Sequence, residues 1–116
     1  MTLSQIIEEL ELCPVHLVEG EDPEVTSVYC GDLLSDVLAH VQPDSIWFTI
    51  QGHVNIVAVA QLRDVACVVL VNGVSPDPQT VAKAQTQDVT ICGSDRTSAE
   101  LAMALAGKLR WNDDTE

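Results

Sequence analysis

The sequence predicts an α/β fold in three layers, in which a mostly parallel sheet of about four or five strands carries helices on both faces. From Val25 onward, segments typical of strands and of helices alternate with short connections, which is the pattern of parallel strand–helix–strand units. Residues 67–71 are apolar throughout, as in a strand covered on both faces. The 116 residues are enough to bury one core. We therefore expect one domain over residues 1–110 and an acidic tail over 111–116.

The N-terminal segment predicts a helix and a short strand. A helix is expected over residues 3–11, because its apolar residues have the spacing of one helical face; they are Leu3, Ile6, Ile7 and Leu10. Pro14 is expected to end this helix, since proline interrupts helical hydrogen bonding. Residues 15–18 predict a short strand.

Four strand–helix pairs follow. Runs of β-branched and other apolar residues predict strands, over 25–30, 45–50, 67–71 and 89–92. Helical periodicity and helix-start residues predict helices, over 32–40, 54–62, 79–87 and 97–109. Pro78 suits the first turn of the third of these helices. The sequence does not fix the order of the strands in the sheet.

The composition limits the classes of partner. Hydrophobic residues make up 47% of the chain but aromatic residues only 3%, so the core must be aliphatic. Eighteen acidic residues against five basic ones give a formal net charge of −13, which disfavours nucleic acids and anionic membranes as partners. The first residues include Glu8, Glu9 and Glu11 and no base, unlike a signal peptide. We expect a cytoplasmic protein.

The four cysteines are widely spaced and include no C-x-x-C pair; they are Cys13, Cys30, Cys67 and Cys92. A zinc site normally shows close pairs, and a disulfide framework belongs to secreted chains with small cores. Cys67 lies within an apolar run and is expected to be a small buried hydrophobe. Inert thiols are the favoured interpretation, and neither a metal nor a cofactor is predicted.

Candidate ligand-binding residues lie in the loops that follow the strands, because ligands of open parallel sheets bind beyond the carboxyl ends of the strands. Glycines there allow close backbone approach, and helix N-termini favour anions. The candidate residues are Asp32, Gln51, Gly52, His53, Asn55, Asn72 and Gly73. His53 is the best candidate for acid–base behaviour.

Structural roles compete with these assignments. Helix capping is the favoured role of the acidic and hydroxyl residues at helix starts, namely Asp32, Ser94 and Asp95. For Asn72-Gly73 a plain turn is at least as good an interpretation as a ligand contact. The polar residues of the 51–55 loop exceed what a turn requires. For these residues, contact with a ligand or with another subunit is as good an interpretation as structural hydrogen bonding.

Catalytic signatures are missing from the sequence. It contains no G-x-x-x-x-G-K-[ST] phosphate loop, no G-x-G-x-x-G and no G-x-S-x-G. Arg96 is the one base in the candidate loops, so a phosphate would be held weakly in a chain this acidic. No catalytic residue is predicted.

Several segments together resemble the DRTGG domain family, over residues 3–109: 29–37, 47–60, 71–74, Pro76-Asp77 and 98–102. The resemblance implies a domain similar to the N-terminal domain of HPr kinase/phosphorylase. Related domains in phosphotransacetylases and between CBS domains of some pyrophosphatases look regulatory or assembly-forming. Stand-alone copies resemble proteins encoded near iron-only hydrogenase and NADH-linked redox genes of anaerobic bacteria. The "serine kinase" label of relatives does not transfer, because the phosphate loop is missing.

The chain departs from the family pattern at the residues that name it. Gly52-His53-Val54 stands where the family often has G-D-R, and Val71-Asn72-Gly73 stands where it has T-G-G. This departure puts a shared ligand in doubt and fits a subfamily with a changed site.

The favoured function is a non-catalytic regulatory, ligand-sensing or scaffold domain that forms a homodimer, with a hydrogenase or other redox protein as a partner. The first alternative is an adenine-nucleotide sensor that acts through the 51–55 loop together with Asp32 and Asn72-Gly73. The second is a small enzyme with His53 or Asp32 as general base.

Overall fold

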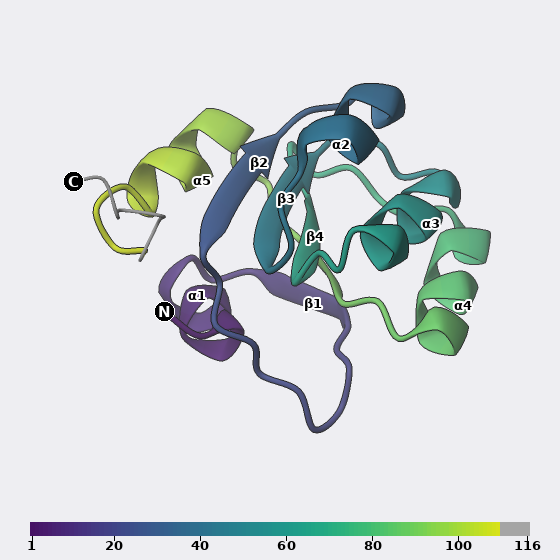
Figure 1. Cartoon of the computed structure of the whole chain (residues 1–116), viewed down its shortest axis with the longest axis horizontal. Coiled ribbons are helices and arrows are strands. Elements are labelled where there is room, and N and C mark those ends of the chain that lie inside the picture. Colours follow the sequence, from purple (N-terminus) through teal and green to yellow (C-terminus); the bar gives the residue numbers. More distant parts are fainter. Residues whose placement is uncertain (110–116) are drawn as a thin grey trace.

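The structure is a computed structural model that describes residues 1–109. Its five strands form one sheet in the order β1-β5-β4-β3-β2 (Figure 1). The strands are β1 (Cys13–His16), β2 (Ser27–Cys30), β3 (Ser45–Thr49), β4 (Cys67–Leu70) and β5 (Ile91–Gly93). Strands β2 to β5 are parallel, and β1 pairs antiparallel with β5 at one edge. The predicted α/β class with a mostly parallel sheet is therefore confirmed.

Five helices cover both faces of the sheet: α1 (Leu3–Glu9), α2 (Leu34–His40), α3 (Asn55–Leu62), α4 (Pro78–Gln87) and α5 (Ser98–Ala104). On one face, α2, α3 and α4 pack through residues such as Val37, Ile56 and Ala84 against Trp47 and Leu70 of the sheet. The other face is covered by α1 and α5, which bury the following residues against Phe48 and Val69: Ile6, Leu10, Leu101 and Leu105. The three predicted layers are present.

The chain changes face after β5. Strands β2, β3, β4 and β5 are neighbours in chain order, and the helices that connect them lie together on one face. Helix α5, which follows β5, lies on the opposite face (Figure 1). The loop after β4 and the loop after β5 therefore leave the sheet in opposite directions.

The bounds of all ten elements differ from those predicted, by one or two residues except at the end of the last helix. The first helix ends at Glu9, because Glu11 has a left-handed backbone (φ 55°), and Pro14 lies inside β1 instead of ending the helix. The first strand is Cys13–His16 and not 15–18. The last helix covers Ser98–Ala104 and not 97–109. The tail predicted over 111–116 lies outside the described residues.

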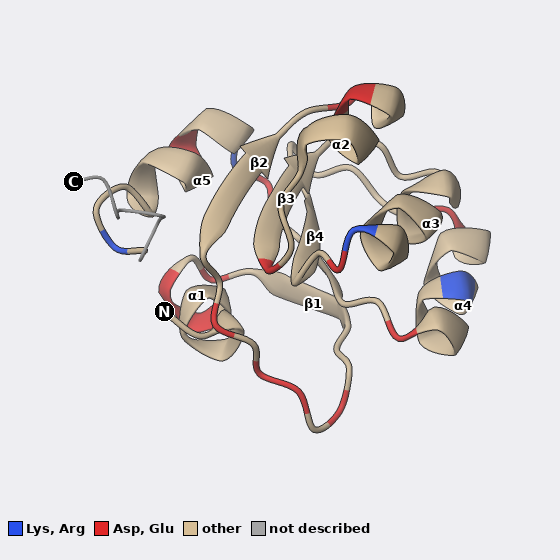
Figure 2. Ribbon diagram, viewed as in Figure 1, with Lys and Arg blue, Asp and Glu red and all other residues tan. Residues whose placement is uncertain are grey.

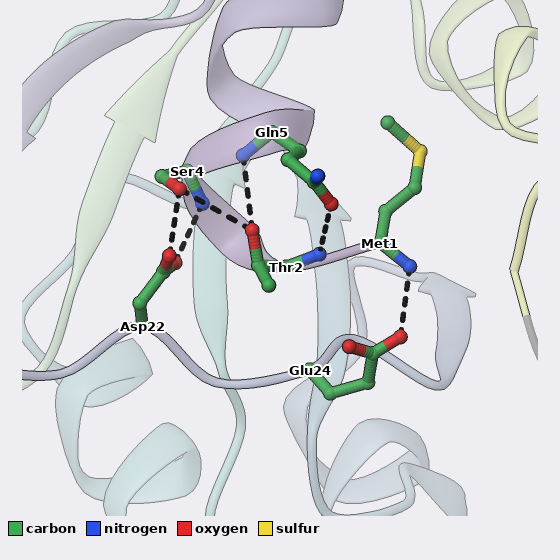
Figure 3. Close-up of polar contacts among 6 residues, drawn as sticks. All are labelled: Met1, Thr2, Ser4, Gln5, Asp22 and Glu24. Atoms are coloured by element: carbon green, nitrogen blue, oxygen red, sulfur yellow. Dashed lines mark hydrogen bonds and ion pairs between the residues drawn. The ribbon is translucent and has the colours of Figure 1, made fainter.

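Helix α1 is held in place by the acidic loop that follows β1. The Thr2 hydroxyl caps the helix by accepting from the Gln5 N–H, and the Gln5 side-chain oxygen accepts in turn from the Thr2 N–H. The Asp22 carboxylate accepts from the Ser4 N–H (2.8 Å) and hydroxyl (2.7 Å), and Glu24 pairs with the Met1 amine at 2.9 Å (Figure 3). The two hydrogen bonds from Ser4 lower the pKa of Asp22.

Charged residues lie on the helices and loops, and the five strands contain no Lys, Arg, Asp or Glu (Figure 2). The longest helix within residues 1–109 is α4, with 10 residues. A membrane span needs about 20 residues, so no helix in this part of the chain could cross a bilayer.

Candidate functional site

The predicted site residues lie at the edge of the sheet where β2 to β5 have their carboxyl ends. We divide this carboxyl edge into two halves. The β2/β3 half comprises the loops at 31–33 and 50–54, which lead into α2 and α3. The β4/β5 half comprises the loops at 71–77 and 94–97, which lead into α4 and α5.

In the β2/β3 half, Asp32 joins the two loops. One of its carboxylate oxygens accepts from the hydroxyl of Thr49 (2.9 Å) and from the N–H of Ile50 (2.9 Å). Gln51 donates its side-chain amide to the Asp32 carbonyl at 3.0 Å. Trp47, which is fully buried, donates its ring N–H to the Gly31 carbonyl at 2.9 Å. These bonds fix the first loop onto the end of β3.

The helix-capping roles predicted for Asp32, Ser94 and Asp95 are wrong. Leu33 is the residue at the N-cap of α2, and no side chain caps that helix, because Asp32 is turned toward Thr49. Thr97 caps α5, in a reciprocal pair with Glu100. The Ser94 hydroxyl accepts from the Arg96 N–H at 3.1 Å, which is a bond within the turn. The bonds from Thr97 lower the pKa of Glu100.

Gly52 lies where two loops meet. Its carbonyl accepts from the Asp77 N–H (3.0 Å) and from the hydroxyl of Thr80 (2.7 Å). A Cβ atom at this position would lie 2.7 Å from the Ser75 carbonyl oxygen. A side chain does not fit there, so glycine serves close packing of the 50–54 loop against the loop before α4.

His53 and Asn55 are exposed at the start of α3. The His53 Nδ1 atom accepts from the Asn55 N–H at 3.2 Å, so a neutral ring carries its proton on Nε2. Within residues 1–109, His53 forms no hydrogen bond with Asp32. The two general-base candidates therefore form no hydrogen-bonded pair.

In the β4/β5 half, Asn72 and Gly73 form a turn in which both residues have left-handed backbones (φ 59° and 72°). The Asn72 N–H donates to the Arg96 carbonyl (3.0 Å), and the Gly73 N–H donates to the Ser94 carbonyl (2.9 Å). A Cβ atom on Gly73 would lie 3.1 Å from an oxygen of Asp95. The turn therefore has a structural function: it joins the loop after β4 to the loop after β5.

A cavity of about 430 Å³ opens beside this turn. Its walls come from the loop after β4 (Gly73 to Pro76), from the end of β5 and the loop after it (Gly93 to Arg96), and from the segment between α1 and β1. It lies where the chain changes face, and the crevice between diverging loops is where open α/β sheets bind ligands. The volume falls within the range of ~300–1,000 Å³ for small-molecule pockets.

The structure thus separates the predicted site residues into two groups. Asp32 and Gln51 are joined by a hydrogen bond within the β2/β3 half, and Gly52 links that half to Asp77 and Thr80. Of the predicted residues, Gly73 lines the cavity. Sequence reasoning missed the residues of the cavity wall that come from the N-terminal segment, such as Glu11 and Cys13. No spacing in the sequence brings residues 10–15 next to residues 93–96; the antiparallel pairing of β1 with β5 does so.

Sequence reasoning also missed two buried threonines. Thr49 and Thr80 are each 0% exposed, and their hydroxyls hold Asp32 and the Gly52 carbonyl. For Thr49 a signal was available, because it is a polar residue at the end of the apolar run Ile46-Trp47-Phe48.

The two buried cysteines lie together in the core. Cys67 of β4 and Cys92 of β5 belong to the apolar cluster under α1 and α5. Hydrogen bonding with Cys92 and burial raise the pKa of Cys67 well above its usual range. Burial, with a smaller effect from Asp32, raises the pKa of Cys30. Cys67 and Cys30 therefore stay protonated at neutral pH, whereas the hydrogen bond with Cys67 lowers the pKa of Cys92.

A larger cavity of about 510 Å³ lies at the opposite edge of the sheet. Carboxylates from four turns line it: Glu21, Asp44, Asp64 and Asp88. The three aspartates have left-handed backbones (φ 54–61°), which places them as turn residues between a helix or loop and the next strand. No group of three or more His, Cys, Asp or Glu side chains within residues 1–109 is arranged to hold a metal ion.

Comparison with known proteins gives a likeness of fold. No protein-family model and no curated protein matches the sequence. Among solved structures, the chain is similar to the CBS and DRTGG domains of the regulatory region of Clostridium perfringens pyrophosphatase, in complex with the activator diadenosine tetraphosphate. The TM-score is 0.72 at 13% identity, and the match covers 93% of this chain and 47% of that one. This chain therefore spans about half the length of that regulatory region, and the likeness supports a DRTGG-related fold.

Proposed function

We propose that this chain is a non-catalytic regulatory domain of the cytoplasm that senses a small molecule at the carboxyl edge of its sheet. The observation that carries the proposal is the cavity at the point where the loops after β4 and β5 diverge. The solved structure of similar fold is itself a regulatory region in complex with a nucleotide activator. The lack of a catalytic motif in the sequence supports the same proposal.

A thermal-shift panel of adenine nucleotides, amino acids and redox cofactors tests for sensing. A ligand at about a hundred times its Kd stabilises the folded state by about 2.7 kcal/mol, which raises the Tm by several degrees for a domain of about 100 residues. We expect at least one small molecule to give such a shift without being turned over. If every compound leaves the Tm unchanged, the sensing function is contradicted and a protein-binding scaffold is the better assignment.

A nucleotide is the second candidate ligand, at the 51–55 loop. Exposed His53 and Asn55 offer hydrogen-bonding groups there, and the activator of the similar regulatory region contains adenosine. Under this alternative, His53→Ala removes the Tm shift given by AMP or ATP. Asn72→Ala, on the neighbouring exposed turn, distinguishes whether that turn takes part. A shift that survives both substitutions argues against the loop as the nucleotide site.

The domain is also proposed to form a homodimer through the edge of β2. The opposite edge strand, β1, contains Pro14 and an irregular register between Pro14 and His16, two features that block strand addition. Strand β2 has neither feature and carries no charge. Next to it on the carboxyl edge, Leu33 is 69% exposed and Ile50 is 45% exposed. A second β2 strand could pair there without repulsion between acidic side chains.

Light scattering at tens of micromolar protein tests the dimer. Leu33→Glu is expected to shift the mass from dimer to monomer, because a charge would enter the apolar contact. Leu62→Glu is the matched control, since Leu62 is 71% exposed and lies on α3, away from β2. A monomeric wild type would contradict the dimer, as would equal effects of the two substitutions.

A redox or hydrogenase protein is the proposed macromolecular partner, on the ground of the family resemblance alone. The acidic surface would suit a partner with a basic face. Co-purification with an iron-only hydrogenase, weakened by added salt, is the expected observation. Binding that does not respond to salt would contradict an electrostatic contact of this kind.

A further inference from the structure

We propose that the cavity of the β4/β5 half binds a small zwitterion of the α-amino-acid type with an aliphatic side chain. The inference rests on the proposed sensing function and names its ligand. It follows from three properties of the cavity wall: one cation with no hydrogen-bonded partner among residues 1–109, two carboxylates and an apolar part.

The cation is Arg96. Its backbone is held by the Asn72 N–H, which donates to its carbonyl, and by the Ser94 hydroxyl, which accepts from its N–H. Its guanidinium forms no hydrogen bond and no salt bridge with any side chain or carbonyl of residues 1–109, and its charge acts at longer range on Glu100 of α5, whose pKa it helps to lower. An arginine whose backbone is fixed and whose fork of donors is unused suits a carboxylate ligand.

The carboxylates are Asp95 and Glu11. Asp95 belongs to the same loop as Arg96, and one of its oxygens lies over Gly73, at 3.1 Å from where a Cβ would be. Glu11 reaches the cavity from the opposite wall, at the left-handed turn that ends α1. An ionised carboxylate can only accept hydrogen bonds, and neither of these two is paired with a Lys or Arg of the described residues. They suit an ammonium group.

Part of the remaining wall is apolar, beside the hydroxyls of Ser75 and Ser94. Leu10, Val15, Val74 and Pro76 line it, from the end of α1, from β1 and from the loop before α4. An aliphatic substituent that packs against these side chains would remove apolar surface from water, which is favourable. A compound with a carboxylate, an ammonium group and an aliphatic side chain therefore matches the wall group by group.

Net charge separates this ligand from a nucleotide. The chain carries −13, and the cavity wall itself has two acidic groups for one base. A polyanionic phosphate compound would be repelled by this field. A zwitterion has no net charge, so the negative field of the chain does not repel it. Its two charged groups can still pair with the opposite charges of the cavity wall.

The experiment measures binding of L-leucine to the full chain by calorimetry, beside isocaproate, which lacks the ammonium group, and isopentylamine, which lacks the carboxylate. We expect leucine to bind and each truncated compound to bind at least about tenfold more weakly, since a hydrogen-bonded charge is lost. Arg96→Gln is expected to weaken leucine by at least about tenfold. Lys83→Gln, which removes the same charge from the middle of exposed α4, leaves the affinity unchanged.

The outcomes separate this inference from the function on which it rests. Equal affinity for leucine and isocaproate would overturn the zwitterion. Binding of AMP but not of leucine would overturn the inference and leave the sensing function standing. Leucine binding that Arg96→Gln does not change would overturn the site. If neither leucine nor any compound of the panel binds, the inference and the proposed function both fail.

Discussion

The two halves of the carboxyl edge use their polar residues differently. In the β2/β3 half, Asp32, Thr49 and Gln51 bond to one another and to the backbone. In the β4/β5 half, backbone groups of Asn72 and Gly73 join the two loops, and Arg96 and Asp95 are among the residues that line a cavity. Polar residues in a loop thus do not indicate by themselves whether the loop serves the fold or a ligand.

The physical origin of the difference is the path of the chain. Helices α2 and α3 lie on the same face, so the loops after β2 and β3 run side by side and their polar atoms reach each other. Helices α4 and α5 lie on opposite faces, so the loops after β4 and β5 separate beyond their first residues. Space for a ligand results from this divergence.

The largest effect is expected for Gly52→Ala, which tests how tightly the loops are packed. The new Cβ would lie 2.7 Å from a backbone oxygen of Ser75, and backbone cannot rotate away as a side chain can. We expect a loss of about 2–3 kcal/mol in the free energy of unfolding, measured by urea denaturation. Gly93→Ala is the control, since its nearest contact would be 3.8 Å; a similar loss there would contradict the steric explanation.

The order of strands and helices could be predicted from the sequence, whereas the role of Asp32 and the position of the cavity could not. The alternation of strands and helices was readable, because runs such as Cys67–Leu70 are apolar and end in turn residues. The role of Asp32 was not, since capping and bonding to Thr49 require the same residue type at the same position. The cavity could not be predicted either, because it depends on which face of the sheet α5 covers and on the pairing of β1 with β5.

The second prediction removes the bond network of the β2/β3 half. Asp32→Ala leaves the buried Thr49 hydroxyl and the Ile50 N–H without their acceptor. We expect a loss of about 1–3 kcal/mol in unfolding free energy, again by urea denaturation. Asp32→Asn keeps one acceptor oxygen and should lose less. If Asp32→Ala leaves the unfolding free energy unchanged, the polar residues of the β2/β3 half do not stabilise the fold, and the proposed difference between the two halves is wrong.

The third prediction concerns the turn that joins the loops of the β4/β5 half. Gly73 has φ +72°, so Gly73→Ala is expected to cost about 1–2 kcal/mol from backbone strain. Gly73→Asn should cost less, because asparagine tolerates this conformation better than alanine does. Thermal unfolding of the two variants checks the order. A Gly73→Asn variant less stable than Gly73→Ala would show that space beside Asp95, and not backbone strain, sets the cost.

The smallest effect on stability is expected for Arg96→Gln. Its guanidinium has no hydrogen-bonded partner within residues 1–109, so the unfolding free energy should change by less than about 0.5 kcal/mol. Urea denaturation beside Asp32→Ala makes the contrast between the halves quantitative. A loss from Arg96→Gln as large as that from Asp32→Ala would mean that Arg96 also serves the fold, and the β4/β5 half would lose its distinction.

The most direct test of the account is an amide NMR titration of the chain, with L-leucine and AMP added separately. We expect a bound small molecule to move the amide signals of Gly73, Ser75, Ser94 and Asp95, while those of Ile50 and Gln51 stay near their free positions. Signals that move only in the 50–55 segment would place the site in the other half. A spectrum that neither compound changes would contradict ligand sensing at this edge.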